Sequence, residues 1–238
     1  MQSKRCSAMY DPYLYNDVSV LKNKLELKNQ DKLNQFESAV FQLAFLKLRE
    51  KPFKVNKATH ILKIHKMLFG EVYEWAGEIR IINIEKQEVV LAGSSVMYED
   101  KKLIHKQLLE LDKQLSKLNI DENFIINISK IIATLWQIHP FREGNTRTVV
   151  VFLYLILQNY NLKINFELLE KHAKYFRNAL VLASIGEYSE PEYLQKILKE
   201  AIFGTGDTKT KEHINNDYNK IRDYEVSNYK YNYHTKKQ

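Results

Sequence analysis

Residues 122–159 read ENFIINISKIIATLWQIHPFREGNTRTVVVFLYLILQN. Two strongly apolar stretches, Glu122–Ile138 and Asn145–Asn159, lie at the two ends of this segment, and both have the length and spacing of buried helices. Between them stands the polar run HPFREGNTR, in which Pro140 prevents the first helix from continuing. The sequence therefore predicts a polar loop at residues 139–147, held between two helices of the core.

Helical spacing of apolar residues extends over most of the remaining chain. Apolar side chains recur at the i, i+3 and i+4 positions of a helix in further segments, at residues 31–51, 57–69, 99–118, 166–182 and 191–203. The chain has only 7 glycines and 4 prolines among 238 residues, which leaves few sharp turns and favours helices. We therefore expect a mostly α protein.

One segment departs from the helical pattern. Two β-branched stretches, Ile79–Ile84 and Val89–Leu91, flank the polar triplet Glu85-Lys86-Gln87. Short β-branched runs on both sides of a polar turn are typical of a β-hairpin. We expect one small hairpin here.

Composition excludes several classes of protein. The chain is 45% hydrophobic and 27% charged, close to the average for soluble globular proteins. The longest apolar run, Val149–Leu157, is far shorter than the roughly 20 residues that span a bilayer. The first residues lack the apolar stretch of a secretory signal, and the single cysteine, Cys6, fits a reducing compartment. We expect a cytoplasmic protein with no membrane partner.

The charge pattern does not indicate a nucleic-acid partner. The formal net charge is +7, but the 36 basic residues are interspersed with 29 acidic ones. The sequence contains neither a Cys/His finger nor an RNP-like aromatic strand. We expect a basic solvated surface and no specific nucleic-acid binding.

The loop between the two buried helices carries groups suited to phosphate. The backbone N–H groups of Gly144, Asn145 and Thr146 lie at the start of a helix, where they lack intrahelical acceptors and the macrodipole attracts anions. Arg147 adds a fixed positive charge whose fork fits phosphate oxygens. Phe141 is apolar within a polar run, so we expect it to anchor the loop in the core.

Two further side chains of the loop point to catalysis. Glu143 stands beside the anion-binding amides, and a carboxylate there requires a cation between the two, for which phosphate-bound Mg²⁺ is the usual one. His139 has an ordinary pKa near neutrality, as a general base requires. These residues predict phosphoryl or nucleotidyl transfer, and a purely helix-capping histidine is the alternative.

The run His139–Arg147 resembles the signature of the Fic family (filamentation induced by cyclic AMP), commonly H-P-F-x-[D/E]-G-N-G-R-x-x-R. Upstream, Tyr73–Arg80 (YEWAGEIR) resembles the start of that family's flap hairpin. The resemblance covers residues 15–203 and implies a Fic fold, a helical bundle with a small β-hairpin flap over the active site. Its domains would be an N-terminal segment at 1–30, a Fic catalytic domain at 31–203 and a polar tail at 204–238.

The resemblance implies a protein adenylyltransferase that moves AMP from Mg-ATP to a Ser, Thr or Tyr hydroxyl of a target protein. His139 would be the general base, and Glu143 would hold Mg²⁺ between the α- and β-phosphates. The phosphates would be bound by Gly144, Asn145, Thr146 and Arg147, the arginine neutralising charge on the leaving group.

The resemblance also implies binding sites for the target and the base. The target segment would dock on the flap by adding a strand, at Glu85, Lys86, Gln87 and Glu88. Tyr175 and Ser184 fall where the family builds its pocket for the nucleotide base.

The sequence departs from the family pattern at two positions. Thr146 replaces the second glycine of the signature, which brings a β-branched side chain to a place where backbone approaches phosphate. Val150 replaces the final arginine, removing a charge-assisted contact of about 1.5–3 kcal/mol. Nucleotide preference therefore stays open.

The family's inhibitory motif, [S/T]-x-x-x-E-[G/N], has no clean copy in the chain. Thr208–His213 matches except at its last position and lies in the polar tail. We expect no intramolecular inhibition, and control instead by the flap or by a separate antitoxin-like protein, as in a toxin–antitoxin pair.

Other readings remain open at this point. The nearest is a Doc-like phosphotransferase or a transferase of another nucleotide, although Glu143 and Gly144 argue against the Doc branch. A non-catalytic binding module with a decayed nucleotide site is the alternative of another class. Monomer and homo-oligomer are both open, as are the roles of bacterial toxin, regulator and effector secreted into a host cell. His60 and His65 do not have the spacing of a metal pair, and we expect both at the surface.

Overall fold

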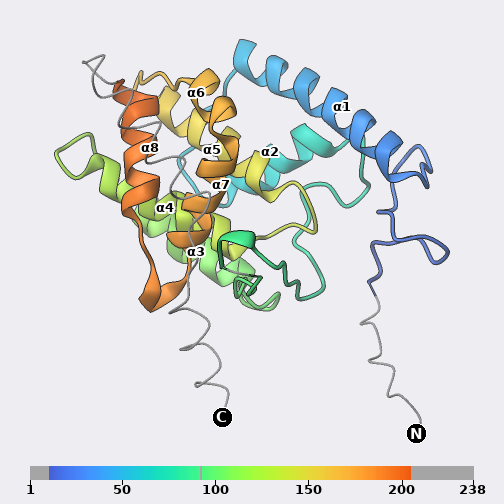
Figure 1. The fold of residues 1–238 in the computed structure, drawn as a ribbon. Coiled ribbons are helices and arrows are strands. Elements are labelled where there is room, and N and C mark those ends of the chain that lie inside the picture. The colour runs from blue at the N-terminus through green and yellow to red at the C-terminus, as the bar shows by residue number, and fades with distance from the viewer. Residues whose placement is uncertain (1–10, 92, 205–238) are drawn as a thin grey trace, which may run out of the picture.

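The computed structural model describes residues 11–91 and 93–204, and nearly all regular structure in them is helical (Figure 1). The helices are α1 Gln30–Glu50, α2 His60–Phe69, α3 Ile104–Leu115, α4 Phe124–Ile138, α5 Asn145–Asn159, α6 Phe166–Lys171, α7 Ala173–Leu182 and α8 Glu192–Phe203, with the 3-10 turns η1 Val89–Leu91 and η2 Gly186–Tyr188. The mostly α prediction is confirmed. The predicted helix at 166–182 is divided at His172, whose backbone leaves helical geometry and ends α6. The motif-like run Thr208–His213 lies outside the described residues.

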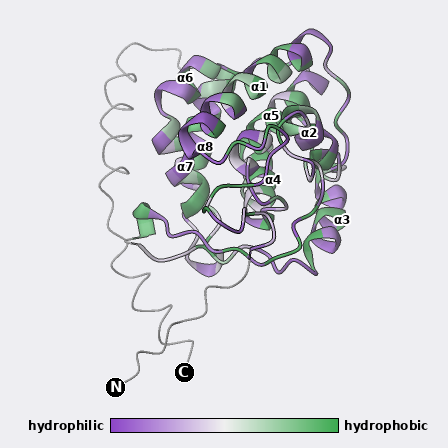
Figure 2. Ribbon diagram, turned by 90° about the vertical axis from the view of Figure 1, so that its right-hand side faces the viewer, coloured by the Kyte–Doolittle hydropathy of each residue, from purple (hydrophilic) through white to green (hydrophobic). Residues whose placement is uncertain are grey.

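Helix α5 forms the centre of the fold. It is buried on almost every side, so it must be covered by neighbours all round. It packs against α2 and α4, and α4 in turn packs against α3, α7 and α8. The outer helices are amphipathic, as the alternating hydrophobic and hydrophilic colours of α3 illustrate in Figure 2. None of the described helices is both long enough and apolar enough to cross a membrane.

Helix α1 covers one side of this centre through its contact with α2. Its start is fixed by Asn29, whose side chain accepts a hydrogen bond from the Lys32 N–H. Leu33 and Leu48 are buried, and so is Glu37, an acidic residue in the middle of the helix. A buried carboxylate needs a partner, and the partner of Glu37 is Arg147 in the first turn of α5.

Residues 79–98, here called the flap, do not form the predicted pair of strands. No strand is assigned anywhere in residues 11–91 and 93–204, and the second predicted strand is instead the 3-10 turn η1. A single antiparallel bridge joins Gln87 to Ser95. Side chains take the place of ladder partners: Arg80 donates to the Ile82 carbonyl at 2.6 Å and Lys101 donates to the Ile81 carbonyl at 2.6 Å.

The flap nevertheless keeps the alternation of an extended chain. From residue 80 to residue 90, even-numbered side chains are buried or half-buried and odd-numbered ones are exposed. Lys86 and Glu88 therefore turn inward, whereas Glu85 and Gln87 face outward. This alternation brings Lys86 to Glu143 in the loop between α4 and α5, and Glu88 to Arg177 on α7.

Candidate functional site

The loop at residues 139–144 is held in place by the flap and by its own backbone. His139 ends α4 in the left-handed conformation, with φ 49° and ψ 60°. The buried Arg80 of the flap fixes this turn, because its Nε donates to the His139 carbonyl and its N–H donates to the Pro140 carbonyl, both at 2.8 Å. Within the loop, the Asn145 side chain accepts from the Phe141 N–H at 3.0 Å and donates to the Phe141 carbonyl at 2.8 Å.

His65 on α2 packs against the loop and is buried, so its predicted surface position is wrong. It is fully buried, and its ring stacks on Phe141 with centroids 3.7 Å apart. Its Nδ1 accepts from the Gly77 N–H at 2.8 Å, which leaves Nε2 protonated to donate to the Glu143 carbonyl at 3.0 Å. Burial is the main cause that lowers the pKa of His65 to about 3. Helical periodicity identified its apolar helix but not the two backbone groups that fill its hydrogen-bonding capacity.

Gly144 is required at the turn into α5. Its φ is +80°, a conformation that side chains other than glycine's disfavour. A Cβ at this position would also lie 2.7 Å from the Phe69 ring and 3.3 Å from Nε2 of His65. The loop backbone therefore passes so close to α2 that no larger residue fits.

The imidazole of His139 presents an unpaired nitrogen. Its Nδ1 lies 3.1 Å from the Trp136 carbonyl, an acceptor only, so Nδ1 carries the proton and Nε2 has a free lone pair. Nε2 is buried and has no hydrogen-bond partner among the described residues. The ring stacks on Tyr98 of the flap, with centroids 3.8 Å apart.

The surroundings of His139 hold it in the neutral form. Burial, followed by the charge of Lys86, lowers its pKa well below the usual value, and the Trp136 carbonyl acts in the opposite direction. The ordinary near-neutral pKa assumed from sequence is thus corrected. Arg80 and Arg177 add smaller contributions of the same sign as Lys86.

Glu143 lies near the end of the loop, and each of its two carboxylate oxygens has its own partner. Oε1 accepts the Gly144 N–H at 3.0 Å, and Oε2 is 3.2 Å from Nζ of Lys86. Burial alone would raise the pKa of Glu143, but Lys86, the Gly144 amide and Arg147 outweigh it and hold the pKa below its usual value. The carboxylate is therefore ionised and already carries a cation.

The first turn of α5 offers unpaired amide donors. Its first intrahelical bond is from the Thr148 N–H to the Gly144 carbonyl, and no side chain of the described chain caps its start. The amides of Asn145 and Thr146 precede that bond and lack intrahelical acceptors. They follow Glu143 by two and three residues in the sequence.

Arg147 is already neutralised by a residue distant in sequence. Its Nη2 donates to Oε1 of Glu37 on α1, and the hydroxyl of Tyr73 donates to the other oxygen of that carboxylate. The guanidinium carbon lies 5.5 Å from the ring centre of Phe41 and 4.8 Å from that of Phe69. The predicted phosphate ligand is thus held in an ion pair and lies beside two stacked aromatic rings.

Thr146 is the meeting point of two donors. Its Oγ1 accepts from Nε1 of Trp136 at 3.0 Å and from Nη1 of Arg177 at 3.3 Å. Nη2 of the same arginine donates to Oε1 of Glu88 at 2.7 Å, and the Tyr98 hydroxyl reaches that oxygen at 3.4 Å. The Thr146 hydroxyl thus joins α5 to α4 and α7, and Arg177 links it onward to the flap.

The two residues predicted for a base pocket lie in different surroundings. Tyr175 is buried, and its hydroxyl donates to the Tyr193 carbonyl at 3.2 Å. Ser184 donates to the carbonyls of Ala133 and Leu180, at 3.1 and 2.6 Å, and lines a pocket of about 980 Å³.

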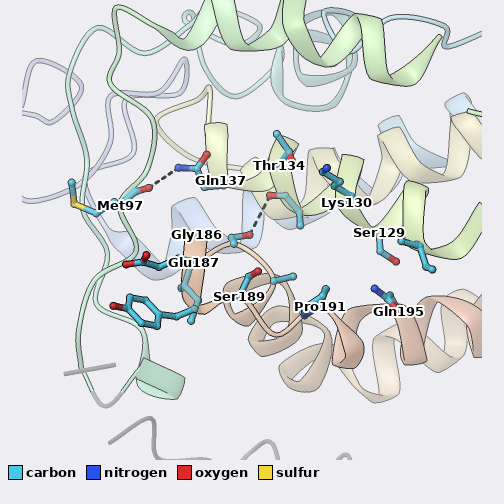
Figure 3. A pocket seen from close by; sticks show the side chains of 16 residues that line it. Met97, Ser129, Lys130, Thr134, Gln137, Gly186, Glu187, Ser189, Pro191 and Gln195 are labelled. Carbon is cyan, nitrogen blue, oxygen red and sulfur yellow. Dashed lines mark hydrogen bonds between the residues drawn. The ribbon is translucent and has the colours of Figure 1, made fainter. Parts of the chain in front are cut away.

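That pocket lies between α4 and the connection from α7 to α8 (Figure 3). Thr134 and Gln137 line it from α4, and Met97 closes it where the flap ends. Gln137 donates to the Met97 carbonyl at 2.7 Å. Gln137 is two residues before His139 in the sequence, but no residue of 139–147 lines the pocket.

The residues at the loop fit a magnesium ion that is shared with a ligand. The described residues contain no group of three or more His, Cys, Asp or Glu side chains that could hold a metal by themselves. Glu143 supplies one ionised carboxylate, on which the Lys86 ammonium now stands as a cation. Mg²⁺ is commonly bound by one or two carboxylates together with water and substrate phosphates.

Comparison with known proteins gives a consistent result. Residues 55–157 match the model of the Fic/DOC family. The chain is 30% identical over 184 residues to the probable protein adenylyltransferase y4lH of Sinorhizobium fredii, covering 77% of this chain and 93% of the relative. It is 31% identical over 179 residues to the protein adenylyltransferase VbhT of Bartonella schoenbuchensis, covering 75% of this chain and 36% of the relative.

Solved structures agree in fold. The BepC protein of Bartonella tribocorum, with bound AMPPNP, superposes with a TM-score of 0.67 at 22% identity, covering 80% of this chain and 95% of that one. The N-terminal Fic domain of a putative cell filamentation protein of Bartonella quintana, with bound ADP, gives a TM-score of 0.66 at 24% identity, covering 80% and 94%.

Proposed function

The chain belongs to the Fic/DOC family, and from that premise we propose that it is a protein adenylyltransferase, transferring AMP from Mg-ATP to a hydroxyl of a target protein. The observation that carries the proposal is the free Nε2 of His139, buried at the end of α4 beside the amide donors of α5. The names of the relatives y4lH and VbhT support the same activity.

His139 acts as the general base. Because Nδ1 is held by the Trp136 carbonyl, Nε2 keeps a free lone pair that could accept the proton of a target hydroxyl. The depressed pKa of His139 keeps this nitrogen unprotonated at neutral pH, ready to accept the hydroxyl proton. The hydroxyl oxygen then attacks the α-phosphate, and pyrophosphate leaves with the electrons of the broken P–O bond.

Glu143 and the first turn of α5 hold the triphosphate. The ionised carboxylate of Glu143 would bind Mg²⁺, which neutralises phosphate charge when it is present. Its Lys86 partner must then move away from Oε2. The amides of Asn145 and Thr146 would donate to phosphate oxygens, and the positive end of α5 favours their negative charge.

The pocket beside Ser184 is suited to the nucleotide base. Its volume of about 980 Å³ lies at the upper end of the range of small-molecule sites. It combines apolar walls with polar edges at Gln137 and Thr134. We assign the base to this pocket. The AMPPNP and ADP bound to the two Bartonella structures support binding of an adenine nucleotide by this fold.

The flap is suited to receive the target chain. Residues 80–90 alternate like a strand, and within the described chain only Gln87 makes a β-bridge there, to Ser95. The backbone of residues 83–85 makes no hydrogen bond to the described chain and would offer a short edge to which an extended peptide can add. Glu85 and Gln87 face outward and would contact the target, whereas Lys86 and Glu88 face the nucleotide site.

Transfer of label from ATP tests the proposal. A bacterial lysate incubated with the protein and α-labelled ATP should yield labelled protein bands with the wild type and none with His139→Ala. His105→Ala, an exposed histidine on α3, is the matched control and should label like the wild type. Label from γ-labelled ATP in place of α-labelled ATP would instead establish a phosphotransferase.

A further inference from the structure

Arg177 reaches the phosphate-binding loop from a different helix. It stands on α7, yet its Nη1 lies 3.3 Å from Oγ1 of Thr146 in the first turn of α5. Its guanidinium carbon is 5.9 Å from the ring centre of Trp136, whose Nε1 donates to the same oxygen at 3.0 Å. The threonine that replaces a glycine of the family signature therefore fixes this guanidinium beside the unpaired amides of α5.

The position of Arg177 coincides with the face of α5 from which the signature arginine is missing. Val150 follows Thr146 by four residues, so both lie on one face of the helix. Helical side chains lean toward the N-terminus, so an arginine at position 150 would extend its head toward Thr146. Val150 instead packs against the core, and Arg177 enters the same region from α7.

The two arginines near the loop differ in how their charge is neutralised. Arg147 is paired with Glu37 on helix α1 and lies beside the rings of Phe41 and Phe69. Arg177 is paired with Glu88, which belongs to the flap. A shift of the flap separates Arg177 from its carboxylate, whereas Arg147 stays paired unless a whole helix moves.

From these contacts we propose that Arg177 is a phosphate-binding residue and supplies the guanidinium that position 150 lacks. It binds the outer phosphates of the nucleotide, and the Glu88 carboxylate occupies the guanidinium until they arrive. This inference rests on the proposed function, since it concerns the same nucleotide site. Two N–H groups of one guanidinium, now on Thr146 and Glu88, suit the bidentate binding of a phosphate.

Calorimetric binding of tripolyphosphate tests the proposal, with adenosine as the uncharged probe. Arg177→Met should weaken tripolyphosphate binding by about tenfold or more, the usual effect of losing a charge-assisted hydrogen bond, and leave adenosine affinity unchanged. Arg177→Lys should lose less tripolyphosphate affinity than Arg177→Met, because lysine keeps the positive charge but not the two-pronged guanidinium. Arg49→Met removes an exposed arginine from α1 and serves as the control. Thermal unfolding establishes that each variant is folded.

Two further variants test whether phosphate replaces Glu88 as the partner of Arg177, and whether an arginine at position 150 can replace Arg177. Glu88→Gln should tighten tripolyphosphate binding several-fold, because the competing carboxylate is gone. In an Arg177→Met background, Val150→Arg should recover most of the lost affinity, because it places a guanidinium on the same face of α5. Absence of that recovery would refute the equivalence of the two positions.

The outcomes separate this inference from the proposed function. The inference is overturned if Arg177→Met binds tripolyphosphate with wild-type affinity. It is also overturned if the variant loses as much affinity for adenosine as for tripolyphosphate, because Arg177 then has only a structural role. If tripolyphosphate binding depends on Arg177 but no label is transferred from α-labelled ATP, the phosphate contact stands and adenylyl transfer fails. A wild type that binds no tripolyphosphate overturns both.

Discussion

Nζ of Lys86 lies 3.2 Å from Oε2 of Glu143, so a flap lysine sits on the carboxylate that is suited to hold magnesium. The two side chains are about one-third exposed, at 32% and 35%. A magnesium ion bound at Glu143 would compete with Lys86 for this oxygen. We therefore expect metal binding and displacement of Lys86 to be coupled.

Replacing Lys86 should make magnesium bind more readily. In Lys86→Met the Glu143 carboxylate has no competing cation, so the Mg²⁺ concentration that half-saturates nucleotide binding should fall. A partly exposed ion pair is worth about 0.2–1 kcal/mol, which corresponds to a decrease of up to about fivefold. Calorimetric titration of ATP at graded Mg²⁺ measures this. Lys102→Met, an exposed lysine nearby, is the control, and a higher Mg²⁺ requirement in Lys86→Met would mean that the lysine assists the phosphates.

His139 should titrate below the range of an ordinary histidine. Its folded pKa is lowered, so the imidazole stays neutral as pH falls past about 6.5, where a free histidine gains its proton. NMR of the ring nitrogens, assigned by comparison with His139→Ala, should report a neutral ring protonated on Nδ1 at pH 6.5. A resonance that titrates at or above pH 6.5 would contradict the buried, base-ready state.

His65 should make stability depend on pH in the acidic range. Its pKa is about 3 when folded and about 6.5 when unfolded, so the unfolded chain binds an extra proton between these values. Stability is therefore complete above pH 6.5 and falls as pH decreases toward 3, by up to about 1.4 kcal/mol per pH unit. Urea unfolding of His65→Gln should show a shallower pH dependence than the wild type. The exposed His105→Gln is the control, and equal slopes in His65→Gln and wild type would refute the assignment.

Gly144 and Gly93 form a matched pair for the loop backbone. Both have positive φ, at +80° and +83°, but a Cβ at Gly144 meets Phe69 at 2.7 Å, whereas at Gly93 it meets nothing within 4 Å. Gly93→Ala should cost only the left-handed strain of about 1–2 kcal/mol. Gly144→Ala should cost more in denaturant unfolding and should also lose nucleotide binding. Equal costs would show that α2 gives way and that the loop is less constrained than its contacts indicate.

The pocket that we propose for the base can be filled from α4. Thr134→Trp places a large ring in the cavity lined by Ser184 and Gln137, so adenosine affinity should fall by at least tenfold. Tyr175→Phe removes only the hydroxyl bonded to the Tyr193 carbonyl and should leave that affinity unchanged. Adenosine titration of both variants decides between the two positions predicted from sequence, and the opposite result would move the base to Tyr175.

The helices could be predicted because their causes are local. Apolar spacing identified α5 to the residue, and Pro140 marked the end of the helix before it. The flap was harder to predict. Alternation in residues 80–90 is a local signal, but the pairing of two strands is not. Its backbone groups found partners in the side chains of Arg80 and Lys101 instead of a second strand.

The sequence by itself determined a helical protein with a histidine, an acid and helix-start amides gathered in one short loop, because those groups are neighbours along the chain. Only the tertiary structure decided which distant side chains complete that loop. Glu37 pairs with Arg147, His65 supports the Glu143 carbonyl, and Arg177 reaches Thr146. Each of these contacts joins residues from separate helices or loops, and their meeting depends on how the helices pack around α5, which no local pattern records.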